Sequence, residues 1–131
     1  MGTELQILVW SVILGLLHLV VSATLNTLQR GLAWNAGARD GVAKPLTGVA
    51  ARVDRAWHNF LETFVFFAVA VLIVVISQRS TTGTVLGAQL YLWARVAYVP
   101  VYAAGIPYLR SGIWGVAMFG LLMVLRVVVG L

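Results

Sequence analysis

Cysteine is absent from this chain of 131 residues. Disulfide bonds, a cysteine nucleophile and thiolate-ligated metals are therefore excluded. Acidic residues are also scarce. The chain has four aspartates and glutamates and nine lysines and arginines. Charged residues make up only 10% of the sequence, whereas a typical soluble domain has about 25%. This scarcity of charge argues strongly against a soluble protein.

Apolar residues account for 61% of the chain. A folded protein of this size leaves a large share of its surface exposed, so it cannot hide that much apolar surface from water. A lipid bilayer must therefore cover the rest. The length allows a single domain.

Four apolar stretches have the length of about 20 residues that a membrane-spanning helix needs. They cover residues 5–28, 56–77, 85–104 and 113–131. The short connectors between the later stretches favour antiparallel neighbours. The sequence therefore predicts an all-α membrane protein, an antiparallel bundle of four transmembrane helices. The first stretch is longer than the core of a cleaved signal peptide, and we expect it to be retained.

Basic residues are distributed unevenly among the connectors. In membrane proteins they collect on the cytoplasmic side, so we expect the first and third connectors to be cytoplasmic. No basic run with interleaved aromatic residues is present, which argues against nucleic-acid binding. Arg30, Arg39, Lys44, Arg52 and Arg55 lie in or beside the first connector, Arg110 in the third and Arg79 alone in the second.

The second predicted helix carries polar residues where hydrocarbon is expected. Arg52, Arg55, Asn59 and Glu62 are three, four and three residues apart, a spacing that places them on one helix face. A charged side chain at the centre of a membrane helix costs about 2.5–3.5 kcal/mol on insertion scales. Such residues usually face the bundle interior and mark a functional site.

The third predicted helix repeats this pattern. Arg95, Tyr98 and Tyr102 share a face, and Arg110 and Ser111 follow near the start of the fourth helix. Guanidinium groups therefore outnumber carboxylates at one end of the bundle. This surplus predicts an anionic ligand, since arginine binds carboxylates and phosphates through paired hydrogen bonds.

A purely structural interpretation is also open. Glu62 and Arg95 could form one buried ion pair that only fixes helix register, and the tyrosines could be packing residues. His18 and His58 are isolated, and we expect them to be packed or hydrogen-bonded and not to bind a metal. No metal site is predicted.

These motifs resemble those of the MAPEG family, the membrane-associated proteins in eicosanoid and glutathione metabolism. The resemblance covers nearly the whole chain, including its four spans, and the second-helix motif is the most specific part. It rests on Arg52-x-x-Arg55-Ala56-x-x-Asn59-x-x-Glu62, on Ala94-Arg95-Val96-Ala97-Tyr98 with Tyr102, on Arg110-Ser111, and on the turn Ala38-Arg39-Asp40-Gly41.

The resemblance implies a homotrimer that binds glutathione between adjacent subunits. Arg52 belongs to the implied binding set, and Arg55, Asn59 and Glu62 would hold the carboxylates and amino group of the tripeptide. A neighbouring subunit would complete the pocket through Arg95, Tyr98 and Tyr102. Arg110 would lie beside the thiol, with Ser111 next to it.

The implied activity is that of a glutathione-dependent transferase or peroxidase acting on lipophilic electrophiles that arrive from the bilayer. The alternative is a non-catalytic member that binds lipid or acts as a scaffold. His58 stands where some prostaglandin-synthase members have a second arginine, so their specificity is not implied. The abundance of Gly, Ala and Val is typical of a bacterial protein, which would lie in the inner membrane.

Overall fold

The computed structural model describes residues 1–130, and its regular elements are all helices. Four of the helices are long, with between 22 and 29 residues each. A fifth has one turn and lies in the first connector. In chain order the helices are α1 (Thr3–Arg30), α2 (Leu32–Ala36), α3 (Gly48–Ile76), α4 (Thr82–Ala103) and α5 (Pro107–Val129).

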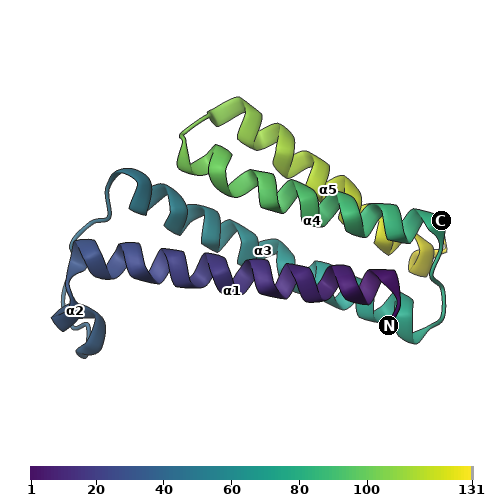
Figure 1. Cartoon of the computed structure of the whole chain (residues 1–131), viewed down its shortest axis with the longest axis horizontal. Coiled ribbons are helices and arrows are strands. Elements are labelled where there is room, and N and C mark those ends of the chain that lie inside the picture. Colours follow the sequence, from purple (N-terminus) through teal and green to yellow (C-terminus); the bar gives the residue numbers. More distant parts are fainter. Residues whose placement is uncertain (131) are drawn as a thin grey trace.

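The long helices form two antiparallel pairs (Figure 1). α1 packs along α3, and α4 packs along α5 as a second hairpin against them. Both chain termini lie at one end, which we call the terminal end. The α1–α3 connector and the α4–α5 turn lie at the opposite end, which we call the arginine end. The prediction of an all-α, four-helix antiparallel bundle is confirmed.

Local sequence signals set the helix boundaries. α1 ends at Gly31, whose φ of 93° lies in a region that glycine adopts without strain. α4 begins with a capping box, in which the side chains of Thr81 and Thr84 each accept a hydrogen bond from the other's backbone N–H. α5 begins with Pro107, since proline lacks the N–H that the first helical turn leaves unpaired.

Two helices start well before the apolar stretches that predicted them. α3 begins at Gly48 and not at residue 56, and α5 begins at Pro107 and not at residue 113. Hydropathy marks the part of a helix inside the bilayer, whereas backbone hydrogen bonding continues through the polar turns beyond it. These extra turns carry Arg52, Arg55 and Arg110. Residue 131, the last of the predicted fourth stretch, lies outside the described residues.

The core joins all four long helices around aromatic residues and glycines. The ring of Tyr91 stacks on Phe67 with centroids 3.9 Å apart, and its hydroxyl shares a hydrogen bond of 2.9 Å with Thr63. α4 and α5 approach most closely at Gly87 and Gly120. A Cβ on Gly87 would lie 2.6 Å from the carbonyl oxygen of Gly120, so the two backbones are in contact.

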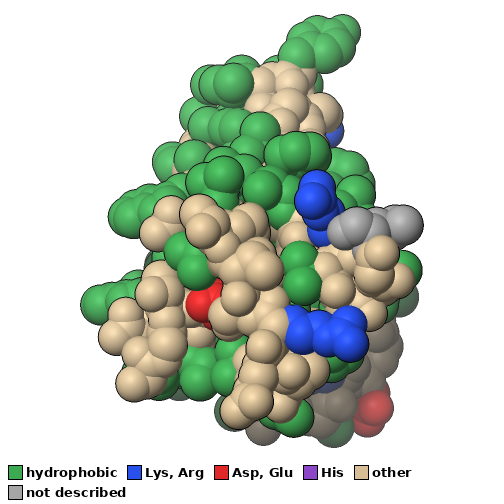
Figure 2. Space-filling view, turned by 90° about the vertical axis from the view of Figure 1, so that its right-hand side faces the viewer, with side chains coloured by type: hydrophobic (Ala, Val, Ile, Leu, Met, Phe, Trp, Pro, Cys, Tyr) green, Lys and Arg blue, Asp and Glu red, His purple; other side chains and the backbone are tan. Residues whose placement is uncertain are grey.

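Three helices in the described part of the chain, α1, α3 and α5, are long and apolar enough to cross a membrane. Their outer faces expose large hydrophobic side chains, and Figure 2 shows such side chains around the terminal end. α4 has sufficient length but lower hydropathy, because it contains Arg95 and three tyrosines. These polar residues are buried within the protein, so the outer face of α4 is still apolar.

Candidate functional site

A pocket lined by three arginines lies at the arginine end, between the start of α3 and the α4–α5 turn. Its volume is about 230 Å³. None of the seven described residues that line it is acidic. The lining residues are Arg52 and Arg55 from α3, Tyr102 from α4, Gly105 and Ile106 from the turn, and Pro107 and Arg110 from α5.

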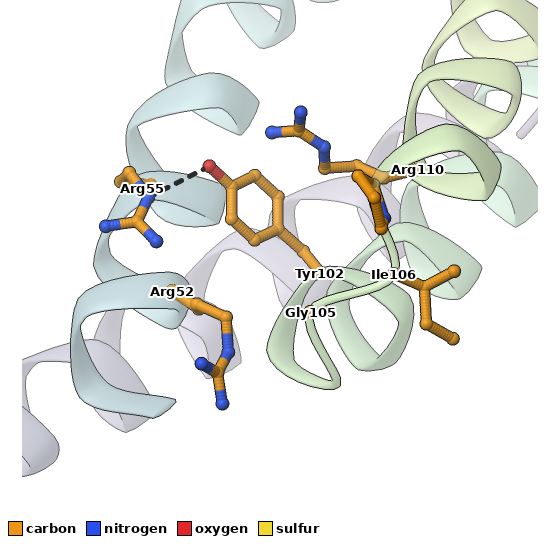
Figure 3. A pocket seen from close by; sticks show the side chains of 7 residues that line it. Arg52, Arg55, Tyr102, Gly105, Ile106 and Arg110 are labelled. Carbon is orange, nitrogen blue, oxygen red and sulfur yellow. Dashed lines mark hydrogen bonds between the residues drawn. The ribbon is translucent and has the colours of Figure 1, made fainter. Parts of the chain in front are cut away.

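The ring of Tyr102 stands in the middle of this pocket (Figure 3). The Nε of Arg55 donates a hydrogen bond of 3.1 Å to the Tyr102 hydroxyl. From the other side, the guanidinium of Arg110 lies over the tyrosine ring, 4.7 Å from its centroid. A cation over an aromatic face is held by the ring quadrupole. Tyr102 therefore positions two cations without neutralising either one.

Gly105 allows the α4–α5 turn to approach Arg52. Its φ of +77° favours glycine, and a Cβ at this position would lie 3.6 Å from Cδ of Arg52. The Nε of Arg52 donates a hydrogen bond of 2.8 Å to the carbonyl oxygen of Ala103, at the end of α4. The turn thereby brings the start of α5, with Arg110, to the side of α3.

The electrostatics of the pocket favour an anion. Arg52, Arg55 and Arg110 bring three positive charges to one small volume, and their protein contacts are to a carbonyl oxygen, a hydroxyl and an aromatic ring. None of these partners carries a full negative charge. Guanidinium groups in such a setting bind carboxylates well, because each can donate two parallel hydrogen bonds.

A second cluster surrounds Arg95 in the bundle interior. Arg95 is 1% exposed and donates from Nη1 to the side-chain oxygen of Asn59 at 2.8 Å. Its guanidinium also lies over the rings of Tyr98 and Phe60, at 4.3 and 5.6 Å from their centroids. The Nε is buried without a hydrogen-bond partner. Asn59, Arg95 and Tyr98, three predicted site residues, thus lie together.

Tyr98 and Tyr102 connect the two clusters. Their rings pack edge to face with centroids 5.4 Å apart. The guanidinium of Arg95 lies over the Tyr98 ring, and that of Arg110 lies over the Tyr102 ring. The predicted residues of α3, α4 and α5 therefore form one connected region that runs from the pocket into the interior.

Glu62 does not join this region. Its side chain is exposed on α3, and it makes no hydrogen bond or ion pair with any residue in 1–130. The alternative of a buried Glu62–Arg95 ion pair is wrong, since Arg95 pairs with Asn59. An exposed carboxylate on an apolar membrane helix is costly. No residue among 1–130 compensates this cost.

Ser111 also lies apart from the pocket lining. It is exposed, and its hydroxyl donates to the carbonyl oxygen of Pro107 one turn earlier, at 3.4 Å. The pocket is also lined by Gly105, Ile106 and Pro107, which were not predicted as site residues. The signal for them was available, because a glycine two residues before a proline is typical of a turn that brings two helices together.

The two histidines have different environments. His18 is buried in α1, with its ring edge to face against Trp57 and Nε2 3.3 Å from the carbonyl oxygen of Val53. The side chain of His58 is 63% exposed on α3. Its Nδ1 lies 2.8 Å from the carbonyl oxygen of Asp54 and 3.6 Å from the Asp54 carboxylate. Nδ1 of His58 is thus held by Asp54, whereas most of the side chain is exposed.

Comparison with known proteins gives one match. The model of the MAPEG family matches residues 7–130, which is nearly the entire chain. No curated protein and no solved structure matches. The matched range includes all of the arginines and tyrosines of the site.

Proposed function

Because the chain belongs to the MAPEG family, we propose that it is an integral membrane enzyme that uses glutathione, as a transferase or peroxidase acting on lipophilic electrophiles. The family consists mostly of glutathione-dependent membrane enzymes. The observation that carries the proposal is the pocket itself. Arg52, Arg55 and Arg110 line it together and no acidic residue does, so its chemistry fits a small molecule with two carboxylates.

The polar side chains along α3 match the charged groups of glutathione. Arg52 and Arg55 carry guanidinium nitrogens that can each bind a carboxylate, and Asn59 supplies an amide one turn further along α3. Glu62 offers the carboxylate that an ammonium group requires. Arg52, Arg55 and Glu62 follow one another along α3, so an extended tripeptide would contact these three, whereas the side-chain oxygen of Asn59 is already bonded to Arg95.

The binding site is proposed to be shared between subunits of a homotrimer. The pocket of a single chain, about 230 Å³, is smaller than the roughly 300–1,000 Å³ of typical small-molecule sites. Glu62, Arg55 and His58 are all exposed on α3. A neighbouring subunit over this face would enlarge the pocket and cover the carboxylate. Arg95, Tyr98 and Tyr102 already lie with α3 of their own chain, so they need not come from the neighbour.

Arg110 is the residue proposed to stabilise the thiolate. A free thiol titrates near pH 8.5, and making it mostly ionised at neutral pH requires a shift of about two units, or about 2.7 kcal/mol. One guanidinium in a site of low dielectric can supply this. Tyr102 holds Arg110 through its ring, and Ser111 places a hydroxyl on the adjacent residue.

The second substrate is proposed to reach the site from the bilayer. The helices around the pocket expose apolar side chains, and membrane lipid would concentrate lipophilic electrophiles beside them. The excess of basic residues at the arginine end favours a cytoplasmic position for that end. In a bacterial cell the chain would lie in the inner membrane.

A groove between α1 and α4 favours a second candidate function, non-catalytic lipid binding. It has a volume of about 440 Å³ and an almost wholly apolar lining. An acyl chain fits such a surface through van der Waals packing, because membrane lipid is itself apolar and burial adds no hydrophobic gain. The lining residues are Trp10, Ile13, Leu14 and Leu17 of α1 with Leu92, Trp93 and Val96 of α4.

Calorimetry with glutathione and the purified full-length protein in detergent tests the proposal. We expect saturable binding, and turnover of a chromogenic lipophilic electrophile that falls at least 100-fold in Arg110→Ala. Arg126→Ala is the matched control, because Arg126 is an exposed arginine in the last turn of α5, at the terminal end. Binding without turnover would favour the lipid-binding candidate. Equal turnover in the two variants would remove Arg110 from the mechanism.

A further inference from the structure

We propose that His58 is the general base of this site, and that its Nε2 accepts the proton of the bound thiol. The inference rests on the proposed function, because it concerns how the same site ionises a thiol. Arg110 can stabilise a thiolate once it has formed, but an arginine remains protonated and cannot accept the proton. The arginine pocket therefore still needs an acceptor.

The contact with Asp54 fixes the tautomer of His58. Nδ1 lies 2.8 Å from the backbone carbonyl oxygen of Asp54. A carbonyl oxygen can only accept a hydrogen bond, so Nδ1 carries the hydrogen and donates it. In the neutral ring Nε2 then bears the free lone pair. His58 is thus held in the form that accepts a proton at Nε2.

The carboxylate of Asp54 lies beside the same imidazole. One of its oxygens lies 3.6 Å from Nδ1 of His58. The other accepts a hydrogen bond of 3.3 Å from Nδ2 of Asn26 on α1. The carboxylate is only 27% exposed and is held by two helices. The residue that orients His58 is therefore itself fixed in place.

His58 faces the same open side as the residues proposed to bind the tripeptide. It follows Arg55 by three residues and precedes Glu62 by four, so all three are neighbours on one helix face. All three are exposed in the single chain. The charged groups around the imidazole, Asp54, Arg55 and Glu62, belong to α3, and the contact from α1 is through the neutral Asn26. A ligand that spans Arg55 and Glu62 must pass His58.

The proposed step is a single proton transfer. The S–H bond of the thiol breaks, the proton joins Nε2 of His58, and the electron pair stays on sulfur beside the guanidinium of Arg110. The thiolate then forms a bond to the electrophilic atom of the lipophile. The imidazolium returns its proton to the atom of the second substrate that received the electron pair, which restores neutral His58.

The test uses His58→Asn in the full-length protein. An asparagine amide can replace Nδ1 as the donor to Asp54 but has no counterpart of the basic Nε2. On rapid mixing with glutathione, the ultraviolet absorbance of the thiolate should appear about 100-fold more slowly than in the natural protein. The dissociation constant for glutathione should stay within twofold. His58→Gln, a second variant without a base, should behave in the same way.

Rescue by a diffusible base separates a base from a structural residue. Added imidazole should restore the rate in His58→Ala. Gln89→Ala, which changes an exposed polar residue of α4, is the control and should keep the natural rate.

The outcomes distinguish this inference from the function on which it rests. If glutathione binds and ionises equally fast in His58→Asn and in the natural protein, His58 is not the base, and the proposed function stands. If the natural protein binds no glutathione, the proposed function is overturned and the inference with it.

Discussion

The Nε of Arg55 on α3 donates a hydrogen bond to the hydroxyl of Tyr102 on α4, and the guanidinium of Arg110 on α5 lies over the ring of the same tyrosine. One aromatic side chain therefore sets the positions of two cations from two other helices. The hydroxyl orients Arg55 through Nε and leaves its terminal nitrogens for a ligand. This geometry makes Tyr102 a residue whose removal should loosen the site without changing its charge.

Tyr102→Phe should weaken glutathione binding. The substitution keeps the ring under Arg110 but removes the acceptor of Arg55, and a hydrogen bond to a charged group contributes about 1.5–3 kcal/mol. We expect a dissociation constant about 10-fold higher, which corresponds to about 1.4 kcal/mol. Titration calorimetry measures it directly.

The chain contains a matched control for this change. Tyr108 lies in the first turn of α5 and is 91% exposed, so Tyr108→Phe removes a hydroxyl from the same end of the bundle without touching the pocket. Its affinity for glutathione should equal that of the natural protein. A Tyr102→Phe variant that binds as tightly as Tyr108→Phe would mean that Arg55 does not depend on the tyrosine.

Asn59→Leu should destabilise the bundle through Arg95. The leucine has a similar volume, but it removes the oxygen that accepts the hydrogen bond of Nη1, and the guanidinium is already buried with Nε unpaired. Leaving a buried donor unsatisfied costs about 1–3 kcal/mol, and more for a charged group. Thermal unfolding in detergent should show a lower Tm.

Asn35→Leu tests whether burial causes this effect. Asn35 also accepts from an arginine, since its side-chain oxygen lies 2.7 Å from Nη2 of Arg39, but both residues are exposed. Water replaces the lost hydrogen bond there, so the Tm should change little. Equal losses in the two variants would contradict the role assigned to the buried Arg95–Asn59 contact.

The fold was largely predictable from the sequence, since hydropathy alone placed the four long helices. The boundaries of the helices were harder to predict from the sequence. Gly48 and Pro107 begin helical turns that lie outside the apolar stretches, and backbone hydrogen bonding sets those limits. Mean hydropathy is also a poor guide to α4. Arg95 lowers the mean hydropathy of this helix, although its side chain points into the bundle.

The residues of the candidate site were easier to predict from the sequence than their arrangement in space. Helical spacing placed Arg52, Arg55, Asn59 and Glu62 near one face, but spacing fixes only an angle about the helix axis. The structure separates them, because Asn59 turns inward to Arg95 while Glu62 is left outside. Which residues of α4 and α5 they meet depends on how the two hairpins pack, which a single sequence does not specify.

The close contact of α4 and α5 predicts that a methyl group added to either backbone destabilises the bundle. Gly87→Ala would place Cβ 2.6 Å from the carbonyl oxygen of Gly120, and Gly120→Ala would place it 2.5 Å from that of Gly87. Each variant must push the helices apart, at a cost of about 1–3 kcal/mol. Both should unfold at lower temperature than the natural protein.

Gly115→Ala is the control for this pair. Gly115 also lies inside α5, but nothing stands within 4 Å of the position that its Cβ would occupy. Alanine there should stabilise the helix by about 0.5–1 kcal/mol, because glycine loses more backbone entropy on folding. A loss of stability in Gly115→Ala as large as in Gly87→Ala would contradict the assignment of the loss to the close contact between α4 and α5.

Glu62→Gln should weaken binding of glutathione but not of an analogue that lacks the amino group. The neutral amide has nearly the same shape as the carboxylate and can still accept a hydrogen bond, but it no longer attracts an ammonium group. We expect the dissociation constant for glutathione to rise about 10-fold, whereas that for the deaminated tripeptide should stay the same.

The comparison of the two ligands isolates the ammonium group because both carry the same carboxylates for Arg52 and Arg55. If Glu62 serves only to pair with a cation of a neighbouring subunit, Glu62→Gln should instead weaken both ligands equally and lower the apparent mass of the detergent-solubilised assembly. Measuring mass by light scattering alongside calorimetry therefore separates ligand recognition from assembly at Glu62, which no residue in 1–130 pairs.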